Sequence, residues 1–190
     1  MKDVYQECPI LENDMFLVRL IDPKDAADLY KVYGDKMALP FFNSDNCHGT
    51  NFYCVTQKMV EESIYYWLKE YEDRGFVRFT IVDKTLQAAV GTIELFNRRA
   101  EDYFNDCGLL RLDLRTDYEN SRAIASILSL ITEPAFELFQ CSMIATKAPI
   151  YAVDRRAALE EAGYTLSAEC LIGSQDNKAY DGYWVKRRDA

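Results

Sequence analysis

The spacing of hydrophobic residues divides the centre of the chain into two segments of different period. Leucines at positions 109, 110, 112 and 114 make a nearly continuous apolar run, which predicts a strand covered on both faces. From Ala123 to Ile131 apolar residues recur every three or four positions, which predicts a long helix. The stretch 115–121 between them predicts a turn. A strand that feeds a helix directly leaves main-chain N–H groups free at the helix start, and these groups suit an anion.

The same patterns predict the remaining elements and their order. We expect strands at 15–21, 76–82, 88–96, 109–114, 141–145, 164–172 and 179–186, and helices at 22–33, 56–71, 123–139 and 152–162. Pro134 predicts a kink or a break in the third helix, and Gly91 predicts a bulge or a close backbone approach. We therefore expect one domain over residues 1–190, of the α+β or mixed α/β class, with helices covering a sheet.

Residues 39–55 have no clear period and are rich in turn-forming residues. Aromatic residues stand at positions 41, 42, 52 and 53, and their rings either cap the core or face a substrate. Cys47, His48 and Cys54 lie in the same stretch, but a closed metal site needs a fourth ligand, so a polar loop is the alternative.

The composition of the chain limits the kinds of partner that we expect. The chain has 190 residues, 49% of them hydrophobic, and a formal net charge of −9, which argues against nucleic acid as a partner. No segment approaches the roughly 18 apolar residues of a membrane-spanning helix, and residues 1–12 do not resemble a signal peptide. We expect a cytoplasmic protein without a membrane partner, in which the six cysteines are reduced thiols.

Four segments carry a resemblance to a known family. They are Phe16-Leu-Val-Arg-Leu, Val90-Gly-Thr-Ile, Leu112-Asp-Leu-Arg-Thr-Asp-Tyr and Leu159-Glu-Glu-Ala-Gly-Tyr. In their order they resemble the GNAT acetyltransferases, in particular the branch that modifies ribosomal proteins and similar amines. The resemblance covers nearly the whole chain and implies a mostly antiparallel, twisted sheet of about seven strands flanked by about four helices. It also implies acetyl-CoA as co-substrate, no metal, an amine acceptor, and a monomer or homodimer.

The resemblance also places a coenzyme site at the start of the third helix. In the family this turn reads Arg/Gln-x-x-Gly-x-Gly/Ala, and its glycines let the backbone approach the pyrophosphate of coenzyme A. The pantetheine arm enters between the fourth and fifth strands, which splay apart. Here Glu119 stands at the first position, and Arg122 and Ile124 replace the glycines. The residues expected to contact the coenzyme are Leu112, Leu114, Asn120, Ser121, Arg122, Ala123, Ile124 and Ala125.

For acetyl transfer a general base must take a proton from the amine. Asp113 and Glu94 are the candidates, and each has an alternative as a solvent-facing or ion-paired carboxylate. His48 is a further candidate base, and Tyr151 is a candidate acid. The oxyanion would be held by a main-chain N–H near Leu112 or Leu114.

Where the family often has Asn followed three residues later by Ser or Ala, this chain has Ala152 and Arg155. Two functions follow: an acetyl-CoA-dependent N-acetyltransferase acting on a protein N-terminus or a small molecule, or a catalytically inactive ligand- or partner-binding module of the same fold.

Overall fold

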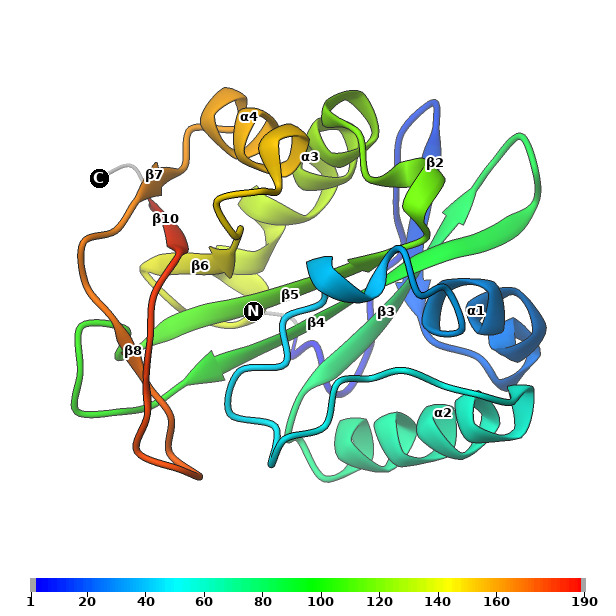
Figure 1. Ribbon diagram of the computed structural model, residues 1–190, viewed down its shortest axis with the longest axis horizontal. Helices are drawn as coiled ribbons and strands as arrows, with labels where there is room; N and C mark the ends of the chain where they lie inside the picture. Colours follow the sequence, from blue (N-terminus) through cyan, green and yellow to red (C-terminus); the bar gives the residue numbers. More distant parts are fainter. Residues whose placement is uncertain (1–2, 189–190) are drawn as a thin grey trace.

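Eight strands form one sheet in the computed structural model, which describes residues 3–188 (Figure 1). Their order across the sheet is β1-β2-β3-β4-β5-β6-β10-β7, and β8 and β9 form a separate hairpin. β5 and β6 pair in parallel, whereas the other neighbours in the sheet pair antiparallel. The strands are β1 (Leu11–Glu12), β2 (Phe16–Leu20), β3 (Val77–Asp83), β4 (Ala88–Arg98), β5 (Cys107–Leu114), β6 (Met143–Lys147), β7 (Thr165–Leu166), β8 (Leu171–Ile172), β9 (Ala179–Tyr180) and β10 (Tyr183–Arg187).

Helices cover both faces of the sheet. In Figure 1, α3 and α4 lie above it, and α1 and α2 lie below it and to the right. Their bounds are α1 (Ala26–Tyr33), α2 (Gln57–Glu72), α3 (Ser121–Leu138) and α4 (Val153–Glu161). This arrangement confirms the predicted α+β class and the helices, and the sheet has eight strands where about seven were expected. Within residues 3–188 no helix is long and apolar enough to cross a membrane.

Capping side chains begin the first two helices. The side chain of Asp22 accepts a hydrogen bond from the main-chain N–H of Lys24, and the side chain of Asp25 accepts one from the N–H of Asp22, so the two form a capping box ahead of α1. Thr56 accepts from the N–H of Met59 at the start of α2. Both starts lie where the sequence predicted them.

The three central strands alternate between an apolar face and a polar face. Phe79, Ile93 and Leu112 are opposite one another in register and belong to the core cluster that also contains residues of α3. Side chains of adjacent residues in a strand point to opposite faces. The row one position away therefore faces α1 and α2, and it consists of Arg78, Glu94 and Arg111. The sheet thus carries charged side chains on a face that helices cover.

The structure corrects three sequence expectations. α3 continues through Pro134 without a break, because Ile131, Ala135 and Phe136 on either side are buried against the sheet. The two long C-terminal strands expected at 164–172 and 179–186 are divided into β7, β8, β9 and β10. β1, a two-residue strand at the edge of the sheet, was not predicted because it is too short to show a period.

Gly91 lies at a bulge, as expected. Ile81 pairs with Gly91 while Val82 pairs with Ala89, so Val90 is the extra residue in β4. A Cβ at position 91 would lie 2.4 Å from the carbonyl oxygen of Asp113 and 2.6 Å from Cδ2 of Leu114. We expect Gly91→Ala to lower the free energy of unfolding by about 3 kcal/mol, measured by urea denaturation, because β5 must move to admit the methyl group.

The control for this substitution is Thr85→Ala in the exposed turn between β3 and β4, which should change stability by less than about 0.5 kcal/mol. Equal effects of the two substitutions would mean that β4 and β5 do not approach each other as closely as described.

Candidate functional site

The space beside the end of β5 is filled by an arginine from α4. The ladder between β5 and β6 runs from Cys107 with Met143 to Leu110 with Thr146, while β5 itself continues to Leu114. Beyond the ladder, the carbonyl oxygen of Leu112 accepts a hydrogen bond of 2.9 Å from Nη1 of Arg155. The side chain of Arg155 therefore occupies the position from which a neighbouring strand or a ligand would approach Leu112.

Arg155 is held in place by a buried carboxylate and a second carbonyl. Its Nη2 donates to Glu119, and its Nε lies 3.3 Å from Oε2 of the same carboxylate. Nη1 also donates to the carbonyl of Phe41 at 3.2 Å. The two side chains are 3% and 4% exposed. Burial raises the pKa of Glu119, against the opposing attraction of Arg155. The pair joins α4, β5, the segment Leu39–Phe41 and the turn before α3.

The start of α3 is capped by its own side chains. Oδ1 of Asn120 accepts from the N–H of Ala123 at 3.0 Å, and Nδ2 of Asn120 donates to the carbonyl of Asp117 at 3.1 Å. Ile124 is fully buried in the core, whereas Arg122 is exposed. Of the two side chains at the family's glycine positions, one therefore lies in the core and the other faces solvent.

The other residues expected at the coenzyme site are buried or half-buried. Leu112, Leu114 and Ala123 are buried in the core cluster, and Ser121 and Ala125 are half-buried on α3. The charged groups near this helix start include the carboxylate of Glu119, which is paired with Arg155, and the exposed guanidinium group of Arg122.

We expect Asn120→Ala to lower the free energy of unfolding by about 1 kcal/mol, because the N–H of Ala123 then loses its acceptor. Thermal unfolding followed by circular dichroism measures the change. Arg122→Ala, two residues further along the same exposed turn, is the control and should leave the midpoint within error. A silent Asn120→Ala would mean that water replaces the cap.

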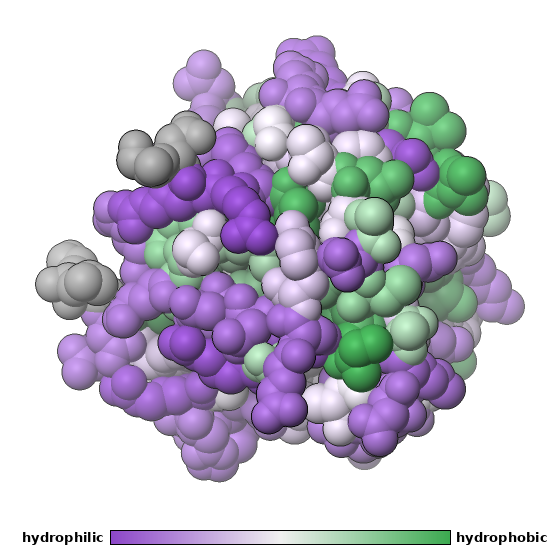
Figure 2. All heavy atoms as spheres, turned by 90° about the vertical axis from the view of Figure 1, so that its left-hand side faces the viewer, coloured by the Kyte–Doolittle hydropathy of each residue, from purple (hydrophilic) through white to green (hydrophobic). Residues whose placement is uncertain are grey.

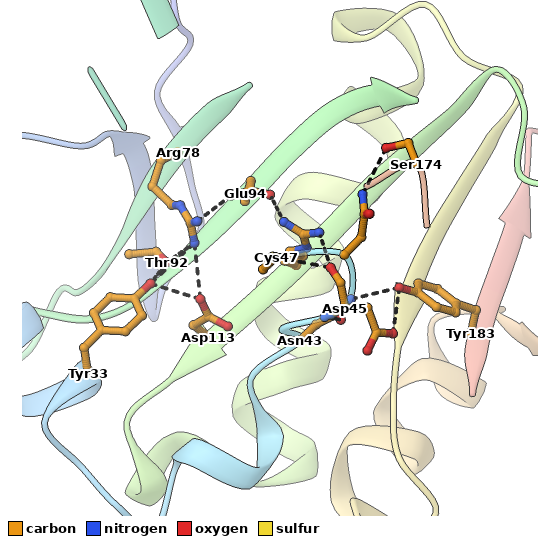
Figure 3. A network of polar contacts seen from close by, with 12 residues as sticks. Tyr33, Asn43, Asp45, Cys47, Arg78, Thr92, Glu94, Asp113, Ser174 and Tyr183 are labelled. Atoms are coloured by element: carbon orange, nitrogen blue, oxygen red, sulfur yellow. Dashed lines mark hydrogen bonds and ion pairs between the residues drawn. The ribbon is translucent and has the colours of Figure 1, made fainter. Parts of the chain in front are cut away.

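A ladder of alternating charge lies on the opposite face of the sheet (Figure 3). Arg78 of β3, Glu94 of β4 and Arg111 of β5 are direct cross-strand neighbours. Nη2 of Arg78 lies 2.5 Å from Oε2 of Glu94, and Nη1 of Arg111 lies 2.6 Å from Oε1. Their side chains are 1%, 4% and 10% exposed, so the ladder is largely shielded from water. Each carboxylate oxygen of Glu94 thus binds one guanidinium group.

A second polar row adjoins the ladder. Nη1 of Arg78 donates to Oδ2 of Asp113 at 3.2 Å, and the hydroxyl of Tyr33 donates to the same oxygen at 3.0 Å. Oγ1 of Thr92 lies 2.6 Å from the hydroxyl of Tyr33. Burial raises the pKa of Asp113, against the opposing attraction of Arg78, and burial also raises the pKa of Tyr33.

The predicted base candidates therefore meet in one network, whereas the predicted acid does not join them. Glu94 and Asp113 are both ion-paired through Arg78. Tyr151 is exposed, and its hydroxyl donates to the carbonyl of Pro40 at 2.6 Å. Sequence analysis missed the arginines at 78 and 111. Each of these arginines interrupts an otherwise apolar strand, and each lies opposite Glu94 when the strands are paired. This pattern could have identified them.

The loop that carries the third candidate base is fastened to the sheet. Oδ2 of Asp45 binds Nζ of Lys147 at 2.6 Å. The same oxygen accepts from the hydroxyl of Tyr183 at 3.1 Å, and the Asp45 carbonyl accepts from Nη2 of Arg111 at 2.9 Å (Figure 3). His48 follows this clamp and is exposed. Among residues 3–188 no group of three or more His, Cys, Asp and Glu side chains is arranged to hold a metal.

A cavity of about 380 Å³ lies over the charge ladder. Its floor includes the ladder and Trp67, all buried, and its rim includes His48, Tyr66 and Gln175, all exposed. The complete lining is Asn46, Cys47, His48, Thr50, Phe52, Ser63, Tyr66, Trp67, Phe76, Arg78, Glu94, Arg111 and Gln175. Of the residues proposed from sequence for catalysis, Glu94 and His48 reach it. In the aromatic loop, Phe42 is buried against Tyr33, as expected of a ring that caps the core, and Phe52 lines the cavity.

No protein-family model and no curated protein matches this sequence. Solved structures of acetyltransferases do match its fold. A GNAT-family acetyltransferase from Bacillus anthracis superposes with a TM-score of 0.68 at 11% identity, over 94% of this chain and 98% of that one. The ribosomal-protein-S5-alanine acetyltransferase from Vibrio fischeri gives 0.66 at 17% identity, over 95% and 97%. RimL, a ribosomal L7/L12 alpha-N-protein acetyltransferase in complex with coenzyme A, gives 0.69 at 12% identity, over 94% and 98%. The chain therefore has the GNAT fold.

Proposed function

We propose that this GNAT-fold protein binds a small ligand in the cavity over the charge ladder, and that its coenzyme cleft is closed by Arg155 and Glu119. The observation that carries the proposal is the hydrogen bond from Arg155 to the carbonyl of Leu112. Beyond the β5–β6 ladder, that carbonyl lies where the fold would admit a pantetheine arm.

The residues at the cleft do not fit coenzyme A in this arrangement. The carbonyl of Leu112 already has a donor, and the arginine that supplies it is buried and paired. The carboxylate of Glu119 lies beside the helix start where a diphosphate would lie, and it already binds Arg155. Displacing Arg155 would leave the buried carboxylate of Glu119 without a counterion, which typically lowers the free energy of unfolding by about 3–5 kcal/mol.

A second candidate is an acetyl-CoA-dependent N-acetyltransferase that moves an acetyl group to a primary amine of a protein N-terminus or a small molecule. Two observations favour it: structural neighbours are acetyltransferases, one of them in complex with coenzyme A, and the exposed first turn of α3 carries the cation of Arg122. For this candidate Glu94 is the proposed base, since it lines the cavity, with Asp113 and Tyr151 as further proposed participants. We expect either protein to be cytoplasmic and monomeric or homodimeric.

Thermal shift with acetyl-CoA and with free coenzyme A separates the candidates. A ligand at about 100 times its dissociation constant stabilises the native state by about 2.7 kcal/mol, which raises the melting temperature visibly. We expect no shift at about 1 mM of either nucleotide. A shift in the wild-type protein, or release of free thiol from acetyl-CoA with any amine of a broad panel, would favour the enzyme.

The matched variant is Glu119→Gln with Arg155→Ser, which removes the buried pair and introduces the neutral residue types that the family has at these positions. If the pair is what closes the cleft, coenzyme A should shift the melting temperature of this double variant and not that of the wild type. A double variant that folds cooperatively and still ignores coenzyme A would show that the two lost glycines, not the ion pair, exclude it.

A further inference from the structure

We infer that the ligand of the cavity over the charge ladder carries a carboxylate on an apolar, aromatic-sized body. The inference rests on the proposed function, in that it names the ligand class of the same cavity. Three features of the lining carry it: unpaired guanidinium donors, an excess of cationic groups, and aromatic walls.

Two arginines that line the cavity each have a buried Nε donor that no residue of the described chain satisfies. Nε of Arg78 and Nε of Arg111 are both buried and have no hydrogen-bond partner within residues 3–188. Both side chains line the cavity, and they are 1% and 10% exposed. A buried donor without an acceptor is unfavourable, and a guanidinium group prefers a carboxylate or phosphate oxygen. An oxygen anion in the cavity would supply the missing acceptors.

Charge around the floor favours an anion over a cation. Two guanidinium groups line the cavity against one carboxylate, that of Glu94, and each oxygen of Glu94 is already engaged by one of them. The neighbouring carboxylates do not line the cavity: Asp113 binds Arg78 and Tyr33, and Asp45 binds Lys147 and Tyr183. An ammonium group at the floor would meet two guanidinium groups and one carboxylate, each of whose oxygens already accepts a hydrogen bond from one of them.

The walls of the cavity are aromatic. Phe52, Tyr66, Trp67 and Phe76 line it, and the guanidinium of Arg78 stacks 4.4 Å from the ring centre of Trp67. A cavity of about 380 Å³ holds a small molecule rather than a peptide chain. The lining thus suits a molecule with an apolar body above and a carboxylate directed at Arg78 and Arg111. This polarity is opposite to that of an amine acceptor.

Protection of a cysteine in the lining tests the inference on the intact protein. Cys47 lines the cavity and is half-buried, whereas Cys170 is exposed and does not line it. We would measure the alkylation rate of both by iodoacetamide, using peptide mass spectrometry at mildly alkaline pH because burial raises the pKa of Cys47. The probes are phenylacetate, phenethylamine and phenylacetamide, which share a ring and differ in charge.

We expect phenylacetate at ten times its dissociation constant to slow the alkylation of Cys47 about tenfold and to leave Cys170 unchanged, while the amine and the amide protect less than about twofold at that concentration. Protection by phenethylamine instead of phenylacetate would overturn the inference in favour of an amine site. Protection by none of the three would overturn it as well, and would leave the exclusion of coenzyme A to be judged by the thermal shift alone.

Two variants separate charge from shape. Arg111→Gln should abolish protection by phenylacetate, and persistence of that protection would overturn the inference. Because Arg111→Gln also leaves Glu94 with one partner, a second variant guards against loss of the fold. Ser63→Phe adds a ring to the cavity lining from α2, at a residue outside the ladder; the Ser63 hydroxyl donates to the carbonyl of Met59. It should abolish protection too, and unchanged protection would place the phenylacetate outside the cavity.

Discussion

Replacing Arg78 by methionine should lower the free energy of unfolding by about 3–5 kcal/mol at pH 7, as measured by urea denaturation. The side chain is 1% exposed and is the common partner of two buried carboxylates, Glu94 and Asp113. Methionine fills a similar volume without a charge, so the loss arises from carboxylates left uncompensated rather than from a cavity. This substitution should be among the most destabilising single changes in the chain.

The size of that loss should depend on pH. In the wild type burial already raises the pKa of Asp113, and Arg78 opposes the rise. Without Arg78 the folded-state pKa of Asp113 moves further above its unfolded value. A carboxyl whose pKa is raised in the folded state stabilises the fold below the unfolded pKa and loses that contribution as pH rises through the folded pKa. The difference between wild type and variant should therefore be smaller at pH 5 than at pH 8.

A surface arginine provides the control for the Arg78 substitution. Arg74 pairs with Asp3, but the two side chains are 56% and 31% exposed. Arg74→Met should cost less than about 1 kcal/mol and show no such pH dependence. If Arg78→Met were equally mild, or if its effect were the same at both pH values, the two carboxylates would have to be solvated in the native state, contrary to their burial.

Sequence patterns predicted the elements of this fold better than its charges. The strand at 109–114 and the helix from 123 follow from period alone, because burial on one or two faces imposes that period. The break expected at Pro134 was wrong, since packing of Ile131 and Phe136 outweighs one lost hydrogen bond. The two C-terminal strands were predicted too long, because the interruptions at 167–170 and 181–182 carry no period of their own.

Ion pairs between segments that are distant in the chain could not be predicted from a single sequence. Glu94 and Asp113 were recognised as candidates, but their partner Arg78 lies 16 and 35 positions away and is identified by strand register alone. Glu119 was recognised as a departure from the family pattern, and so was Arg155. That these two departures compensate each other follows from the contact of α4 with the turn before α3, 36 residues apart in the chain. A paired substitution of this kind becomes visible once both positions are placed in space.

The pair of Arg155 and Glu119 should behave as one energetic unit. We expect Arg155→Ala to lower the free energy of unfolding by about 3–5 kcal/mol, because it leaves the carboxylate of Glu119 buried without a counterion. Glu119→Ala leaves Arg155 with the two carbonyl contacts to Leu112 and Phe41, so its cost should be smaller. The double variant removes both charges and should cost less than the sum of the single variants, by about 1–3 kcal/mol.

Arg156→Ala is the control on the same helix, since Arg156 only stacks over Trp184 at 5.3 Å and should cost about 0.5–1 kcal/mol. Urea denaturation of the four proteins measures the cycle against wild type. Strong coupling means that anything entering beside Leu112 must first separate a buried ion pair, so the cleft is closed by a free-energy barrier as well as by volume. If the single effects simply add, Arg155 could leave its position without leaving Glu119 buried and unpaired. That result would favour the acetyltransferase over the binding protein.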